Sequence, residues 1–306
     1  MVRPISFQLQ AQAIKEINEV PKRIPEDIIT VREWLKKQHH LKAYDDDQTL
    51  LNFLRCCKFS LQNTKNKLDS LYTTKTIVPE LFNNRDPLSA EIQRVLEAGL
   101  IYVLPKLEDN GPRIIIWNMA KCNPDTMSYI TLIKISCMFI DVLLMEDDHS
   151  IISGVLFWAD LKDCPVKYAT QFTPTNLKKH MHIIEKALPL RIKGLHFTNC
   201  PSVIEYVYHV MKSLSLSKLM QRMSLYNNIE SFYSIVPQRL MPKEYGGDND
   251  SMENLKGVWK EKLENRREWF LRDSEYKSNE PLRPGGPKTI SDIFGIKGSF
   301  RKLTID

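Results

Sequence analysis

Apolar side chains recur at helical spacing through the first part of the chain. One segment opens on Pro25 and two acids, carries an apolar stripe to Leu35 and ends in two lysines. Proline and acids at the start of a segment, with cations at its end, are typical of an amphipathic helix. Two more segments of this kind begin at Asp45 and Ser60. We therefore expect an all-helical N-terminal domain over residues 1–95.

From about residue 96 the pattern changes to short apolar runs that alternate with longer amphipathic segments. The runs 101–104, 113–117, 155–159, 191–197 and 223–226 have strand length, whereas 127–145, 174–188 and the segment from Pro201 have helical length. Such alternation predicts an α/β domain with a mainly parallel sheet, here over residues 96–260. A charged helix is expected over 252–276. Residues 261–306 should form its end and a flexible tail.

One predicted helix combines a long apolar stripe with cations that follow it directly. Such a stripe packs in a core more often than it contacts lipid. However, an apolar helix joined to an anion-binding helix is also what a lid operated by a membrane requires. The stripe consists of Val203, Ile204, Val207, Val210, Met211 and Leu214.

Four basic residues form two pairs. Arg191 and Lys193 flank Ile192 on a predicted strand, so the two cations share one face and the isoleucine points to the other. Lys218 and Arg222 are four apart on a predicted helix and also share a face. No acidic residue occurs in 206–229 to relieve the second pair. Two unrelieved pairs indicate an anion site on the outer wall of an apolar compartment. The alternative is a solvated basic face.

Charge is concentrated around these pairs. The 306 residues carry a net charge of +6, and residues 161–222 hold ten Lys or Arg against three Asp or Glu. A patch of this kind suits phosphates or an anionic membrane surface. Nucleic acid is not an expected partner, because no aromatic stacking positions lie between the charges and no zinc finger or basic heptad region occurs.

Cysteine spacing and hydropathy indicate the compartment. None of the six cysteines forms a CxxC pair, so reduced thiols in a reducing compartment are expected. The longest apolar stretch, 135–145, is too short to span a bilayer and contains Asp141. We expect a soluble cytoplasmic protein that touches membrane surfaces transiently.

Residues with catalytic or metal-binding chemistry are few. No GxSxG, P-loop, HExxH or GxGxxG motif occurs. His180 and His182 are two apart on a predicted helix, so they point in different directions and are expected at the surface beside two lysines. The acidic run 146–148 is expected to be a solvated turn. We therefore predict no catalytic residues and no metal site, and do not expect an enzyme.

Four ordered blocks resemble the CRAL-TRIO (Sec14-like) family, in particular its branch of tocopherol-transfer and retinaldehyde-binding proteins with their insect homologues. The blocks are residues 46–59, 154–161, 189–199 and 240–247, and the resemblance extends over roughly 25–259. It implies a helical N-terminal domain and a lipid domain with a sheet floor. A mobile lid helix, at about residues 200–223, would cover a hydrophobic cavity.

The resemblance also implies roles for particular residues. In the tocopherol-transfer branch, two basic residues on the strand and two on the following helix bind the headgroup of a phosphatidylinositol bisphosphate. Matched motif to motif, these are Arg191, Lys193, Lys218 and Arg222, with Arg and Lys exchanged in the first pair. By the same alignment, the cavity is lined by Ile133, Ser136, Ile140, Val155, Ala159, Ile183, Ile184, Leu188, Ile192 and Leu195.

Two of these lining positions depart from the tocopherol-binding branch. Ile140 replaces a hydroxyl residue and Ala159 replaces a bulky aromatic, which leaves Ser136 as the one hydroxyl of the set. The changes argue against tocopherol itself and imply a roomier, drier cavity.

The sequence thus predicts a carrier for a small hydrophobic ligand such as a retinoid, tocopherol or related isoprenoid. Release at membranes would be coupled to phosphatidylinositol bisphosphate at the basic cleft. No cofactor besides the bound ligand is expected. The alternative is a phosphoinositide-sensing adaptor in which the bound lipid is a structural plug.

Overall fold

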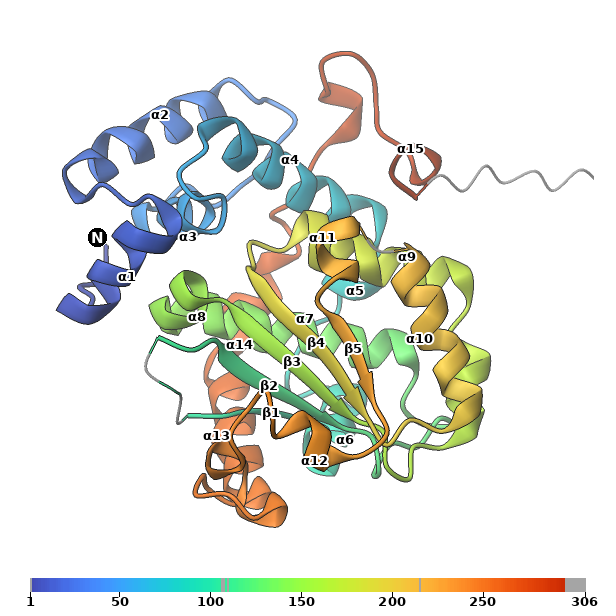
Figure 1. Cartoon of the computed structure of the whole chain (residues 1–306). Helices are drawn as coiled ribbons and strands as arrows, with labels where there is room; N and C mark the ends of the chain where they lie inside the picture. Colours follow the sequence, from blue (N-terminus) through green and yellow to red (C-terminus); the bar gives the residue numbers. More distant parts are fainter. Residues whose placement is uncertain (1, 106–107, 109, 215, 295–306) are drawn as a thin grey trace, which may run out of the picture.

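The computed structural model describes residues 2–105, 108, 110–214 and 216–294 (Figure 1). Its N-terminal part is helical, and the side chains of Ser6, Asp46 and Ser60 cap three of the helices by accepting backbone N–H groups. Such caps satisfy donors that have no partner inside the helix. The helices are α1 (Phe7–Ile17), α2 (Ile24–Lys36), α3 (Asp47–Cys56), α4 (Leu61–Ile77), α5 (Pro79–Phe82) and α6 (Ala90–Ala98).

Five short strands form one sheet, in the order in which they occur along the chain. β1 runs antiparallel to β2, and the other neighbours are parallel. Both faces of the central strands are covered, so their sequences are nearly continuous apolar runs. The predicted fold class, helices followed by a mainly parallel α/β sheet, is confirmed. The strands are β1 (Ile101–Val103), β2 (Arg113–Asn118), β3 (Val155–Asp160), β4 (Ile192–Thr198) and β5 (Met223–Tyr226).

Alternate residues of the strands belong to two separate apolar cores. Ile115 and Leu195 lie in the larger core, which α7, α9 and α10 share, whereas Ile116 and Trp158 lie in the smaller core with α12 (Ile229–Phe232). The helices of the larger side are α7 (Tyr129–Glu146), α9 (Pro174–His182), α10 (Ser202–Leu214) and α11 (Ser217–Met220), with a π-helix at Ile183–Ala187 directly after α9. Helix α8 (Asp148–Ser153) instead packs against α1. Figure 1 shows α10 lying beside α9; the helix leads from the carboxyl end of β4 back to the start of β5.

The C-terminal segment returns to the N-terminal helices. The helix expected over 252–276 is divided at Arg266 into α13 (Met252–Asn265) and α14 (Arg267–Asp273). The chain then pairs with the N-terminal region, where the Ser278 N–H donates to the Tyr72 carbonyl at 3.0 Å and α15 (Ile290–Phe294) follows. Residues 261–294 are therefore built into the fold. The rest of the expected tail, 295–306, lies outside the described residues.

Buried ion pairs join the N-terminal helices to the α/β domain. Arg55 is 1% exposed, and its guanidinium lies 2.8 Å from the Glu19 carboxylate and 2.6 Å from that of Asp148. Arg3 reaches Asp148 as well, at 2.6 Å. The expectation of a solvated turn at 146–148 is wrong, because Asp148 is buried and paired with two arginines. The sequence pattern did not indicate these arginines, since they lie in segments distant from Asp148. Among the described residues, no helix is long and apolar enough to cross a membrane.

Candidate functional site

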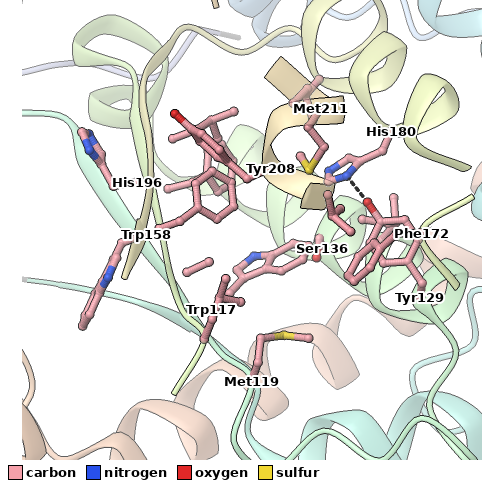
Figure 2. Close-up of a pocket in the computed structure, with 18 of the residues that line it drawn as sticks. Trp117, Met119, Tyr129, Ser136, Trp158, Phe172, His180, His196, Tyr208 and Met211 are labelled. Atoms are coloured by element: carbon pink, nitrogen blue, oxygen red, sulfur yellow. Dashed lines mark hydrogen bonds between the residues drawn. The ribbon is translucent and has the colours of Figure 1, made fainter. Parts of the chain in front are cut away.

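A cavity lies between the sheet and the helices α7, α9 and α10. About 1040 Å³ of space that no protein atom fills lies in the cavity and at its mouth, open solvent included, and almost all of the exposed surface that lines it is apolar. Figure 2 shows Tyr129 and His180 at one end, and Trp158 and His196 at the other. Burial of apolar surface is therefore the main interaction that this cavity offers to a ligand.

Most residues expected around the cavity lie there. Eight line it, namely Ile133, Ser136, Ile140, Ala159, Ile183, Ile184, Leu188 and Leu195. Val155 and Ile192 do not. They are register partners where β3 and β4 begin, and the cavity starts one pleat further along the strands. Val155 is fully buried in the core, and Ile192 lines a neighbouring cleft.

The polar groups of the cavity are few, and among the described residues the buried indole N–H of Trp117 has no hydrogen-bond partner. The Tyr129 hydroxyl lies 2.5 Å from Nδ1 of His180, and burial lowers the pKa of that histidine to about 4. Ser136 donates its hydroxyl to the Leu132 carbonyl of its own helix at 2.7 Å. His180 is therefore a neutral cavity residue, and its expected surface position is wrong. His182 also has a partner inside the protein, since its Nε2 lies 3.1 Å from the Thr74 hydroxyl of α4.

Aromatic side chains form a part of the wall that the sequence interpretation missed. Trp117, Phe157 and Phe197 line the cavity from three adjacent strands, and Phe172 lines it from the chain before α9. Trp117 and Phe157 stand on alternate positions with residues of the larger core, so strand alternation could have identified them.

Helix α10 covers the cavity with half of the expected lid residues. Ile204, Val207 and Met211 line the cavity, and so does Tyr208, which was not expected; its hydroxyl donates to the Met223 carbonyl at 3.2 Å. Val203 is instead 42% exposed. Spacing of three and four residues places positions 204, 207, 208 and 211 on one face of the helix. Val210 and Leu214, on the flank, pack against the core without reaching the cavity.

The four expected cations line one cleft next to the cavity. Arg191, Lys193, Lys218 and Arg222 come together there, and Lys58 is a fifth cation that the sequence interpretation missed. Partial burial and the charges of Arg191, Lys218 and Lys193 lower the pKa of Lys58. Repulsion of this kind is relieved when an anion binds.

The sequence pattern predicted that the first cation pair has no acidic partner, but the structure provides one. The Glu16 carboxylate of α1 lies 3.1 Å from Nζ of Lys193 and 3.4 Å from the Arg191 guanidinium. Arg191 also donates to the Ile152 carbonyl, and Arg222 to that of Ile192. Nothing near the pair in the sequence indicated Glu16, because Glu16 lies more than 170 residues before it.

The cavity and the cleft share a wall. Ile184, in the π-helix, lines both of them. Lys67 of α4 holds this segment by donating to the carbonyls of Glu185 and Leu188 at 3.0 and 3.2 Å. The Glu185 carboxylate accepts the N–H of Leu216 at 2.8 Å, which ties the wall to the segment that carries Lys218. π-Helical turns of this kind are frequent at functional sites.

Comparison with known proteins identifies the family. Residues 97–247 match the model of the CRAL/TRIO domain, and residues 20–92 match that of the Pinta-like UBA domain. The chain therefore contains a domain of the CRAL-TRIO family. This is a family of lipid-binding and lipid-transfer proteins. In the described part of this CRAL-TRIO chain, no group of three or more His, Cys, Asp or Glu is placed to hold a metal ion.

Individual relatives cover most of this CRAL-TRIO chain. The human α-tocopherol transfer protein-like protein is 26% identical over 245 residues, which cover 79% of this chain and 71% of the relative. Clavesin-1 of Xenopus laevis is 26% identical over 234 residues, covering 76% and 70%. The crystal structure of Sfh5 covers 83% of this chain and 92% of its own, with 14% identity and a TM-score of 0.45.

Proposed function

We propose that this CRAL-TRIO protein carries a small hydrophobic ligand, such as a retinoid, tocopherol or related isoprenoid, between membranes. Phosphatidylinositol bisphosphate at the five-cation cleft couples release to arrival at a membrane. The observation that carries this proposal is the wall at Ile184, which a single segment of chain presents to both the cavity and the cleft.

The lining of the cavity supports an isoprenoid-type ligand. Apolar burial contributes about 25 cal/mol per Å² of surface removed from water. The Ser136 hydroxyl is bonded to its own helix, so the polar features near the ligand are the Tyr129–His180 pair and the buried N–H of Trp117, which has no partner among the described residues. A ligand with a long hydrocarbon body and at most a small polar end matches such a surface.

The contacts of the wall support coupling. An anion that draws Lys218 toward the cleft pulls on the segment whose Leu216 N–H is bonded to Glu185, two residues from the end of the π-helix. Because Ile184 belongs to the same π-helix, a shift there changes the wall of the cavity. Charge-assisted hydrogen bonds from Arg and Lys to phosphate supply the affinity.

Exposed apolar side chains on α10 and after it support transient contact of a cytoplasmic protein with membranes. Val203, Tyr206, Leu216 and Met220 are exposed there, Tyr206 by 73%, and Leu216 also lines the cationic cleft. At an anionic bilayer such side chains enter the headgroup region while phosphates meet the cations.

A vesicle-transfer assay tests the proposal. A fluorescent retinoid is moved from donor to acceptor vesicles by protein present at far below one molecule per ligand, with and without phosphatidylinositol bisphosphate in the acceptor. We expect many ligands moved per protein, with acceleration by the bisphosphate lipid. The Arg191→Ala/Lys218→Ala variant should load ligand normally but lose the acceleration. Lys243→Ala, at an exposed lysine away from the cleft, should behave as wild type.

The same assay separates the carrier from the adaptor. Transfer limited to one ligand per protein, with binding to phosphoinositide vesicles retained, would favour the adaptor and contradict the carrier. Equal rates with and without the bisphosphate lipid would remove the coupling.

A further inference from the structure

Glu16 holds a defined position in the cleft. Its carboxylate accepts a hydrogen bond at 2.8 Å from the amide of Gln12, one turn earlier on α1, and its other oxygen faces Lys193 and Arg191. Gln12 is itself buried. It also donates to the Asn110 carbonyl and accepts the hydroxyl of Ser153. Glu16 is therefore an oriented side chain rather than a freely rotating surface acid.

Helix α1 is seated so that it keeps Glu16 there. Ala13 and Ile17 are fully buried against Ile152 of α8. Glu19, just past the end of α1, pairs with the buried Arg55. This small apolar contact and one buried ion pair fix α1 beside the cleft, although α1 precedes both regions that match a family model.

The cleft is therefore divided into two groups of cations. Arg191 and Lys193 pair with Glu16, whereas Lys58, Lys218 and Arg222 form no ion pair with a carboxylate among the residues that the structure describes. The other carboxylate of the cleft, Glu185, accepts the N–H of Leu216. An anion that reaches only the second group leaves Glu16 in place. An anion that spans both groups must compete with it.

We propose that Glu16 is an internal competitor for the cleft, which limits the affinity gained from a second phosphate. The inference rests on the proposed binding of phosphorylated inositol headgroups. A negative charge at this point repels an anion in proportion to the charge the anion brings, and a displaced Glu16 loses two ion-pair contacts. Both effects oppose a bisphosphate more than a monophosphate. The resulting moderate affinity lets a carrier leave the membrane after exchange.

The test compares soluble headgroups and lipids in wild type and Glu16→Gln. Glycerophosphoinositol monophosphate and bisphosphate are titrated by calorimetry, and phosphatidylcholine vesicles containing the corresponding lipids are used in sedimentation. The soluble arm reports the shared phosphate chemistry, and the vesicle arm adds the membrane. Glu253→Gln on α13 removes an equal charge at an exposed acid that also pairs with a lysine, and serves as the matched control. Thermal melting verifies that each variant is folded.

We expect E16Q to bind the bisphosphate about tenfold more tightly, equivalent to about 1.4 kcal/mol, and the monophosphate at most about threefold more tightly. Should E16Q fail to fold, Glu16→Asp, which withdraws the carboxylate by one methylene, is expected to tighten bisphosphate binding about threefold. An unchanged ratio of the two affinities in a folded variant would overturn the inference. If the wild type binds neither headgroup, the proposed function itself fails, so the two failures are distinguishable.

Discussion

Under the proposed function, we expect the closure of α10 over the cavity to set how fast a bound ligand escapes into water. Four buried side chains of α10 line the cavity. Burying one side chain of this size contributes roughly 1.5–3 kcal/mol, so lifting the helix into water costs roughly 6–12 kcal/mol. An open lid is therefore rare in water. A membrane that accepts the apolar face lowers that cost.

Val207→Ala weakens this closure by a calculable amount. The substitution removes two buried carbon groups at about 0.8 kcal/mol each, or about 1.6 kcal/mol. Since 1.4 kcal/mol corresponds to a factor of ten, ligand should escape in membrane-free buffer about tenfold faster. Val203→Ala is the matched control, because Val203 lies on the same helix but is 42% exposed.

The assay follows the fluorescence of a loaded retinoid after dilution into buffer with a soluble cyclodextrin as scavenger. The control variant should stay within about twofold of wild type, as exposed substitutions usually do. Equal escape rates for V207A and V203A would refute the view that the buried face of α10 retains the ligand.

Three further predictions concern stability and ligand contact. Arg55→Met leaves Glu19 buried without its cation and Asp148 with Arg3 alone, and should lower the free energy of unfolding in urea by about 3–5 kcal/mol; a loss below about 1 kcal/mol would contradict the role of this junction. Burial lowers the pKa values of His180, His182 and His196 to about 4. Below pH about 6.5 these histidines therefore bind protons in the unfolded chain, whereas in the folded chain they bind them only near pH 4. The free energy of unfolding should fall as pH falls through this window. Equal urea midpoints at pH 7 and pH 5 would contradict this prediction. Ser136→Ala should change retinoid affinity less than about twofold in fluorescence titration, because that hydroxyl already bonds its own helix, and a larger loss would show that the hydroxyl contacts the ligand.

Local pattern was enough to predict the order of the five strands and of most of the longer helices, but not the helices α1, α5, α6 and α8. Strand β5 begins and ends where the apolar run 223–226 does. Caps and apolar stripes predicted α3 and α4, because those signals lie within a few residues of the helix ends. Helix α1 gave a weaker signal, since only Gln12, Ala13 and Ile17 of its residues are buried.

Contacts between distant segments were not predictable in this way. The interpretation of His180 was right that its side chain and that of His182 point in different directions, but nothing local identified Tyr129 and Thr74 as their partners. Asp148 was likewise predicted to be solvated, because nothing near it in the sequence identified Arg55 of α3 and Arg3 as its partners. Pairing over such separations depends on the tertiary fold, which periodicity along the chain does not encode.

For the cation cleft, the sequence pattern predicted the clustering of the basic residues but not their acidic partner. The spacing within each pair predicted that its two members share a face, and the structure brings both pairs together with Lys58. The absence of acids nearby in sequence, however, did not imply their absence in space, as Glu16 shows. The chain between residues 206 and 229 says nothing about what α1 contributes.

Coupling between cavity and cleft is the central claim, and it is reciprocal by thermodynamic necessity. The most direct measurement is calorimetric titration of soluble glycerophosphoinositol bisphosphate into retinoid-loaded and ligand-free protein. If the anion favours the open state and the ligand the closed one, loaded protein should bind the headgroup at least about fivefold more weakly than ligand-free protein. Equal affinities for the two forms would contradict the account.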